Sequence, residues 1–297
     1  MAKCRTLPMG THKVVCECGR VLEDVNSCRH RFCPLCSVRR ANMWLAKWKA
    51  RLFAVEHWHL VFTLPHDLNF FFQRYAAQMG DIFFAAVSET LTKLLADPQW
   101  LGGRAGALAM LQTWDNQNKQ HPHMHILLTS GGADSSGAWM GLKRGPKFFI
   151  PHLVISRMFR GNFMRLLRQA EYSGAIKAPA GWSFKRRMKF LKDVSEKAFV
   201  VEICGPYPHG EGVLKYFAGH VCGGPIPNSR VVAVSPTHVT FRMKPRPGLT
   251  ELENTLDMQT FLTRLLTHIP PPGFHIVRAY GLYSPSAKKN VTGIPER

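Results

Sequence analysis

Acidic side chains are scarce in this chain of 297 residues, which has 19 Asp and Glu against 39 Lys and Arg and a formal net charge of +20. The imbalance makes a polyanion the expected partner, with nucleic acid ahead of a membrane surface. No apolar run is long enough to span a bilayer, and the first residues lack the apolar core of a secretory signal. We therefore expect an intracellular protein with no membrane partner and with reduced cysteines. The sequence also lacks a phosphate-binding P-loop and a solenoid repeat.

Cysteine is concentrated at the start of the chain, where six of the 8 cysteines precede residue 37. In a reducing compartment such crowding indicates metal binding more than disulfides. Cys33 and Cys36 have the knuckle spacing of structural zinc sites. We expect Zn²⁺ to be held by four ligands from Cys16, Cys18, Cys28, Cys33 and Cys36, with His12 and His30 as further candidates.

The run His-Pro-His-Met-His at residues 121–125 is followed by three apolar residues. In a strand, alternate side chains point to one face, so His123 and His125 can aim at one point while Met124 faces a core. Two imidazoles leave coordination positions open for a third ligand, water and a substrate oxygen, as a catalytic metal requires. The run is thus half of a candidate divalent-metal site.

Hydrophobic periodicity predicts alternating helices and strands, which favours an α+β fold with an antiparallel sheet and helices mostly on one face. Residues 131–146 are expected to form a Gly/Ser-rich loop. Helices are predicted at 37–53, 67–95, 156–172, 210–221 and 258–268, and strands at 57–64, 108–114, 121–128, 199–204, 231–234 and 239–243.

Tyr216 and His220 are four residues apart and share one face of the predicted helix over 210–221. A tyrosine presented beside a histidine-bound metal suggests covalent attack on a DNA or RNA phosphodiester. Basic side chains that could contact the phosphates are clustered at two places. They are Arg39 and Arg40 on the first predicted helix, and Lys185, Arg186 and Arg187 further along.

These residues resemble a known family. His123, Met124 and His125 resemble the HUH motif (histidine, hydrophobic residue, histidine) of single-strand endonucleases in rolling-circle replication, conjugation and transposition. Within that superfamily the chain resembles the single-tyrosine rolling-circle transposases of bacterial insertion sequences and insertion-sequence common regions. The matching stretches are residues 26–36, 59–65, 112–114, 121–125 with Gly131 and Gly132, 225–230, 239–241 and 273–281.

The resemblance implies three parts: a zinc-binding module with a basic helix at 1–53, a ferredoxin-like HUH nuclease domain at 54–245, and a C-terminal extension at 246–297. It implies that Tyr216 attacks single-stranded or hairpin DNA at transposon ends, leaving a 5′-phosphotyrosine and a free 3′-OH. The resemblance also implies that His123 and His125 bind Mg²⁺ or Mn²⁺, which assists this attack. The implied location is the bacterial cytoplasm, in association with the nucleoid.

The third metal ligand differs among relatives. In single-tyrosine transposases it lies one turn after the tyrosine, where this chain has His220. Related replication nucleases place an acidic ligand on the strand before the histidines, which points to Asp115 or Gln112. The chain also has Phe32 where the family often has a histidine, so that position is not expected to bind zinc.

Three alternatives remain at this point. A plasmid replication initiator or relaxase would share the chemistry. A non-enzymatic zinc DNA-binding regulator would need the cysteines and the basic helices but not Tyr216. A metallohydrolase that uses a metal-bound water would need the histidines but would leave no covalent adduct.

Overall fold

The computed structural model describes residues 3–144, 149–244, 253–287 and 291–295. The chain forms two compact units, and each draws on separate stretches of the sequence. The division at residues 53 and 245 therefore stays a prediction. Within the described ranges, no helix has both the length and the apolar character needed to cross a membrane. Unit 1 comprises Met1–Ala50, Asn116–Asn118 and Leu214–Leu265, and unit 2 comprises Arg51–Asp115, Lys119–Val213 and Leu266–Arg297.

Unit 2 is built on an antiparallel sheet with the strand order β11-β4-β5-β3-β7, and the short β6 pairs with β5. Along the chain its central elements run β3, α3, β4, β5, α4 and β7. The spatial order β7-β3-β5-β4 is that of a ferredoxin-like βαββαβ unit. The expected α+β class is thus confirmed. The bounds are β3 His57–Thr63, α3 Ala76–Ala96, β4 Arg104–Trp114, β5 Gln120–Ala133, β6 Trp139–Gly141, α4 His152–Tyr172, α5 Phe184–Glu196, β7 Val200–Tyr207 and β11 Val277–Gly281.

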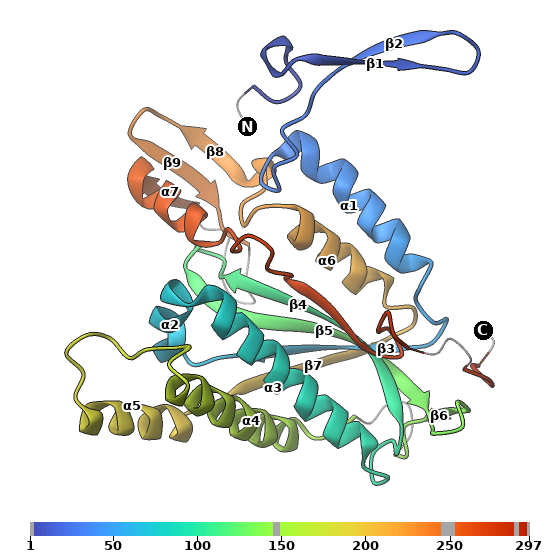
Figure 1. Cartoon of the computed structure of the whole chain (residues 1–297), viewed down its shortest axis with the longest axis vertical. Coiled ribbons are helices and arrows are strands. Elements are labelled where there is room, and N and C mark those ends of the chain that lie inside the picture. The colour runs from blue at the N-terminus through green and yellow to red at the C-terminus, as the bar shows by residue number, and fades with distance from the viewer. Residues whose placement is uncertain (1–2, 145–148, 245–252, 288–290, 296–297) are drawn as a thin grey trace. The chain divides into compact units, whose positions relative to one another are not determined.

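Helices α3 and α4 cover one face of this sheet (Figure 1). Strand alternation sends Phe62 of β3 and Met124 of β5 toward them, and both side chains are fully buried. Phe159 of α4 meets Phe62 at 5.1 Å and Phe83 of α3 at 5.6 Å between ring centroids. Burying each such ring contributes about 1.5–3 kcal/mol. The alternate side chains of these strands, including His123 and His125 of β5, point to the opposite face of the sheet.

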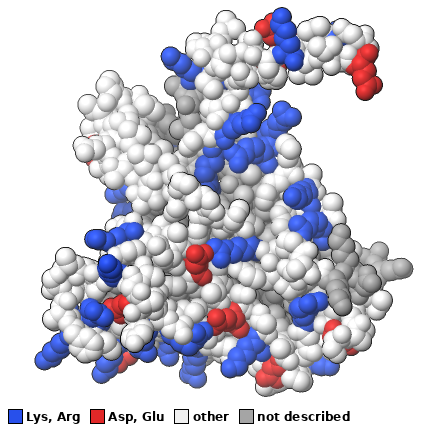
Figure 2. Space-filling model, in the orientation of Figure 1, with Lys and Arg blue, Asp and Glu red and all other residues white. Residues whose placement is uncertain are grey.

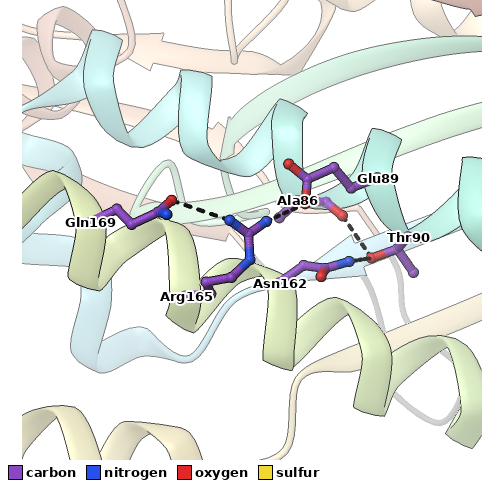
Figure 3. Close-up of polar contacts among 6 residues, drawn as sticks. All are labelled: Ala86, Glu89, Thr90, Asn162, Arg165 and Gln169. Carbon is purple, nitrogen blue, oxygen red and sulfur yellow. Dashed lines mark hydrogen bonds and ion pairs between the residues drawn. The ribbon is translucent and has the colours of Figure 1, made fainter.

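Polar contacts join α3 to α4 above this core (Figure 3). The Thr90 hydroxyl donates to the Ala86 carbonyl at 2.6 Å and accepts from Asn162 Nδ2 at 3.0 Å. Thr90 is fully buried, so both bonds are shielded from water. Arg165 forms an ion pair with Glu89 nearby, but both side chains are exposed.

The helix predicted over 67–95 is divided in the structure. A 3₁₀ turn at His66–Leu68 (η2) leads into α2 at Asn69–Arg74, and α3 begins only at Ala76. Tyr75 breaks the helix with φ −130° and ψ 49°. The break was not predictable from periodicity because apolar side chains continue on both sides, with Phe71 of α2 and Phe83 of α3 both buried.

The prediction that a loop starts at Gly131 is also wrong, since β5 continues to Ala133 and pairs there with β4 and β6. A Cβ at Gly131 would lie 2.6 Å from the Met140 carbonyl oxygen, and one at Gly132 would lie 2.5 Å from the Arg104 carbonyl oxygen. The glycines are therefore there because neighbouring strands approach closely.

Helix α5 forms where the sequence showed only a basic cluster. Ser183 caps it by accepting from the backbone N–H of Arg186 at 3.2 Å, and Leu191 and Val194 are its buried residues.

Unit 1 contains two small antiparallel sheets, β1-β2 and β8-β9-β10, together with helix α1 and most of helices α6 and α7. The hairpin predicted near 231–243 is confirmed as β8 and β9. The bounds are β1 Thr11–Val15, β2 Val21–Val25, α1 Pro34–Lys49, α6 Glu211–Cys222, β8 Val231–Val234, β9 His238–Arg242, β10 Glu253–Asp257 and α7 Met258–Thr267.

The contrast between the buried and the exposed contacts of α3 and α4 can be tested. Thr90→Val keeps the shape but leaves the Asn162 amide without its acceptor, so we expect a loss of about 1–2 kcal/mol in the free energy of unfolding. Arg165→Ala removes an exposed ion pair and should cost no more than about 0.5 kcal/mol. Urea unfolding measures both, and a larger loss for Arg165→Ala would contradict this assignment.

Candidate functional site

The histidine strand β5 places His123 and His125 on the sheet face away from α3 and α4. The intervening Met124 and the following Ile126 belong to the core, as the alternation predicts. His123 pairs across the sheet with Thr63 of β3, and the rings of His123 and His125 lie 4.9 Å apart. The strand therefore presents two imidazoles side by side.

A third imidazole comes from β3. His59 Nε2 lies 3.0 Å from His125 Nδ1. In the register of β3 and β5, His125 is opposite Val61, so His59 is its diagonal neighbour on the same face. Local sequence pattern does not identify His59 as a ligand. A signal is present in the predicted strand over 57–64. His59 has the same parity as Val61 and Thr63, which pair with His125 and His123, so all of them point to one face of the sheet.

The histidines are held in the form that binds a metal. His123 Nδ1 donates to the His121 carbonyl oxygen at 2.7 Å, which leaves the lone pair on Nε2. Burial lowers the pKa of His59, so its imidazole is neutral at physiological pH. Neutral imidazole is the form that coordinates metals.

The donor spacing fits a divalent ion. Two ligand atoms about 2.1 Å from one ion and at right angles to each other lie about 3.0 Å apart, which is the spacing of His59 Nε2 and His125 Nδ1. Imidazole nitrogen favours transition metals over Mg²⁺, which prefers oxygen. His59 and His125, with the ring of His123 4.9 Å from that of His125, are therefore the candidate metal ligands of unit 2.

The two residues considered as alternative ligands, one in β4 and one in the turn that follows it, have other contacts. Gln112 is the cross-strand partner of His123, and its Nε2 donates to the Trp114 carbonyl at 3.1 Å. Asp115 closes the β4–β5 turn, where its carboxylate accepts from the backbone N–H of Lys119 at 2.8 Å. Both remain predictions as ligands.

Helix α6 carries Tyr216 and His220 on one face, with ring centroids 4.1 Å apart. His220 Nδ1 donates to the Tyr216 carbonyl at 2.7 Å, so its lone pair is on Nε2. Burial lowers the pKa of His220 to about 4, with a further contribution from the positive charge of Lys244. His220 is therefore neutral at physiological pH. Leu214 and Phe217 of the same helix are fully buried.

The end of α6 is held by the cysteine knuckle. Arg31 Nη2 donates to the carbonyls of His220 and Val221 at 3.2 and 3.3 Å, which satisfies acceptors that every helix leaves open at its C-terminus. A Cβ at Gly224 would lie 3.2 Å from the Phe32 ring, so the chain beyond the helix packs closely on the knuckle. The helix that presents Tyr216 is thus supported by the segment between Cys28 and Cys33.

Four cysteines of unit 1, Cys4, Cys28, Cys33 and Cys36, have all their sulfur atoms within 4.8 Å of one another. Tetrahedral zinc with Zn–S bonds of about 2.3 Å sets its sulfurs about 3.8 Å apart. The Sγ atoms of Cys4 and Cys36 are 3.5 Å apart, and those of Cys28 and Cys36 are 3.9 Å apart. The cluster therefore fits a structural Zn²⁺.

The pKa of the Cys33 thiol is lowered to about 7. Burial alone would raise it, but hydrogen bonds from the backbone N–H of Cys36 and from neighbouring thiols outweigh that effect. Cys33 is the N-cap of α1, and a helix N-terminus stabilises a thiolate, the form that binds zinc.

The cluster corrects the expected ligand set. Cys16 and Cys18 are exposed at the turn between β1 and β2, outside the cluster, and Cys4 takes part in their place. The hairpin pairs Thr11 with Val25 and so returns the chain to its start, next to Cys4. Sequence spacing could not show this because the hairpin separates Cys4 from Cys28. The other candidates have different partners, since His12 contacts Asn26 and His30 accepts from the Phe32 backbone N–H.

The basic residues expected to contact DNA lie on two helices, one in each unit, and that role stays a prediction. Arg39 and Arg40 are exposed on α1, and Lys185 and Arg186 are exposed at the start of α5. Arg187 instead pairs with Glu171 at 2.8 Å. Basic side chains are spread over the visible face of the molecule while acidic ones are sparse (Figure 2).

Two family models match the chain. Residues 106–291 match a model described as "Putative transposase", and residues 1–64 match one described as "Transposase zinc-binding domain". The chain is 33% identical over 288 residues to the putative transposase y4qJ of Sinorhizobium fredii, covering 94% of this chain and 71% of the relative. It is 24% identical over 290 residues to the transposase for insertion sequence element IS801 of Pseudomonas savastanoi pv. phaseolicola, covering 95% and 68%.

Two solved structures of the conjugative relaxase TrwC in complex with oriT DNA also match. The copper-bound one has a TM-score of 0.27 at 11% identity, and covers 54% of this chain and 67% of the relaxase chain. The other, a metal-bound structure, has a TM-score of 0.28 at 12% identity, with 54% and 68% coverage.

The cysteine assignment predicts which thiols retain zinc. We expect purified wild-type protein to hold about one Zn²⁺ in the thiolate cluster, and Cys4→Ser to lose it because one of four ligands is removed. Cys16→Ser is the matched control and should keep its zinc. Metal analysis after dialysis measures both, and loss of zinc from Cys16→Ser but not from Cys4→Ser would reverse the assignment.

The histidine assignment predicts the effect of His59→Ala. With the zinc cluster loaded, we expect this variant to bind Mn²⁺ about a hundredfold more weakly than wild type, as His123→Ala should, since each loses one coordinating nitrogen. His152→Ala, an exposed histidine at the start of α4, is the control. Titration calorimetry gives the affinities, and an unchanged value for His59→Ala would remove it from the metal centre.

Proposed function

The chain belongs to this family of transposases and carries its zinc-binding domain, and from that premise we propose that it nicks and rejoins single-stranded DNA at transposon ends through a phosphotyrosine at Tyr216. Family membership favours this function over a replication initiator, a relaxase or a non-enzymatic regulator. The chemistry is that of a strand-transfer enzyme, in which one phosphodiester is exchanged for another of similar energy. That exchange needs no ATP, in accord with the missing P-loop.

The observation that carries the proposal is the imidazole cluster of His59, His123 and His125 on the sheet face opposite α3 and α4. Attack on a phosphodiester builds negative charge on the phosphate oxygens, and a pre-positioned cation lowers that barrier. A divalent ion bound by the three imidazoles would supply this charge neutralisation at a phosphate oxygen. The imidazole donors favour Mn²⁺ over Mg²⁺ among the two ions expected.

Tyr216 is the proposed nucleophile. Its Oη attacks the phosphorus, the Oη–P bond forms, and the bond from phosphorus to the 3′ oxygen breaks. The phenol proton is released, and the departing 3′ oxygen takes up a proton to become a free hydroxyl. Rejoining is the reverse: a 3′-OH attacks the 5′-phosphotyrosine, and Tyr216 regains its proton.

The remaining residues position these groups. Neutral His220 has a lone pair on Nε2 beside the Tyr216 ring. We propose that this nitrogen either binds the catalytic metal or accepts a hydrogen bond. Arg31 supports the end of α6 and so keeps Tyr216 in place. Arg39, Arg40, Lys185 and Arg186 would hold the DNA backbone, which predicts that binding weakens steeply with salt.

Single-stranded and hairpin oligonucleotides tiled across the DNA that flanks the coding sequence provide the test. With Mn²⁺ and wild-type protein, we expect a covalent adduct that withstands denaturing electrophoresis and maps to Tyr216. Tyr216→Phe removes one hydroxyl and should abolish the adduct with little change in folding or DNA affinity.

Tyr280→Phe is the matched control. Tyr280 lies on β11, and burial raises its pKa to about 12, which makes it a poor nucleophile. We expect this variant to form the adduct at the wild-type rate. An adduct on Tyr280, an undiminished adduct in Tyr216→Phe, or no adduct with wild-type protein would each contradict the proposal.

A further inference from the structure

One cationic side chain of unit 1, Lys244, lies beside Tyr216, and a second, Arg230, is held next to Lys244 by a shared contact with Asn116. The Lys244 ammonium is 5.7 Å from the centroid of the Tyr216 ring, within the range of a cation–π contact. Lys244 follows β9, and Arg230 closes the short 3₁₀ turn that leads into β8. Strands β8 and β9 are paired, so these two segments end on the same side of one small sheet.

Arg230 is held rigidly. Its Nε donates to the Arg242 carbonyl at 2.6 Å, and its Nη2 donates to the carbonyl and the side-chain oxygen of Asn116, both at 3.1 Å. Asn116 also fixes the Lys244 backbone, because its Nδ2 donates to the Lys244 carbonyl at 2.7 Å and its Oδ1 accepts from the Lys244 N–H at 2.7 Å. One asparagine thus aligns both basic residues.

The charges of this pair are not balanced by acidic groups. In the described part of the chain, neither Arg230 nor Lys244 takes part in an ion pair with a carboxylate. Burial lowers the pKa of Arg230, and burial together with the charge of Arg230 lowers the pKa of Lys244. Two partly desolvated cations that repel each other are stabilised when an anion binds between them.

We propose that Lys244 and Arg230 form a phosphate-binding subsite beside Tyr216 that holds a phosphodiester of the DNA strand. The inference deepens the proposed function, on which the role of Tyr216 rests. Charge-assisted hydrogen bonds from an ammonium and a guanidinium to a phosphate are strong. Nε and Nη2 of Arg230 donate to Arg242 and Asn116, so Nη1 is the nitrogen that would donate to the phosphate. Asn116 is a positioning residue in this subsite, since it carries no charge, binds the Arg230 guanidinium and fixes the Lys244 backbone.

A hydrogen bond to a charged group corresponds to about a tenfold change in affinity or more. The alternative is that Lys244 only packs over the Tyr216 ring. Its methylene stem, without the charge, would be enough for that contact. Lys244→Met keeps that stem and removes the charge, whereas Lys244→Arg keeps the charge. The two variants therefore separate a phosphate ligand from a packing contact.

The first test needs no cleavage. The protein is labelled with 3-fluorotyrosine, the Tyr216 resonance is identified by its loss in Tyr216→Phe, and inorganic phosphate is titrated at constant ionic strength against chloride. We expect a saturable shift of this resonance in wild type and in Lys244→Arg, and about tenfold weaker binding or none in Lys244→Met. Lys215→Met, an exposed charge next to Tyr216 on α6, is the control and should match wild type.

The second test uses the oligonucleotide that forms the adduct. We expect Lys244→Met to slow adduct formation about a hundredfold while thermal unfolding is unchanged, and Lys244→Arg to restore most of the rate. A Tyr216 resonance that ignores phosphate, or a Lys244→Met variant that equals wild type in both tests, overturns the inference. If wild type forms no adduct, the proposed function fails, and the phosphate titration still decides whether the subsite exists.

Discussion

The rest of unit 2 depends on the two-residue alternation of side chains along β5. On one face Met124 and Ile126 join the core beneath α3 and α4, and on the other face His123 and His125 are presented together. The burial of the apolar set fixes the register, because a slip of one residue would turn the histidines into the core and expose the apolar side chains. The same register sets His59 beside His125, so packing energy also determines the geometry of the candidate metal centre.

Unit 1 follows a different principle, since its N-terminal segment has little apolar core of its own. Both faces of the β1-β2 hairpin are exposed, and the adjoining buried cluster consists of cysteines. A metal held by four thiolates can stabilise such a segment where hydrophobic burial cannot. Arg31 and Phe32 connect this segment to the end of α6, because Arg31 donates to the His220 carbonyl and Phe32 packs against Gly224. The zinc module therefore supports the helix that carries Tyr216 as well as adding a basic surface.

The net charge of +20 acts at two ranges in this molecule. Over the surface, scattered Lys and Arg side chains attract a polyanion without regard to sequence. Close to Tyr216, Lys244 supplies a local positive charge, and Asn116 binds both the Lys244 backbone and the Arg230 guanidinium. Neither cation is paired with a carboxylate in the described residues. The general attraction of a polyanion and the local binding of a phosphate are therefore distinct effects. The first depends on the number of Lys and Arg side chains, and the second depends on the fixed positions of Lys244 and Arg230.

Local patterns alone determined the α+β class, the histidine strand, the helix bearing Tyr216 and two knuckle ligands, Cys33 and Cys36. Each of these is encoded by neighbours a few residues apart, where strand and helix periodicity or ligand spacing is directly visible. The third histidine, His59, and the fourth cysteine, Cys4, were decided only by tertiary structure, as was the place of Lys244 beside the tyrosine. These contacts join segments far apart in the chain, and which segments meet depends on strand register and hairpin closure, which spacing along the sequence does not encode.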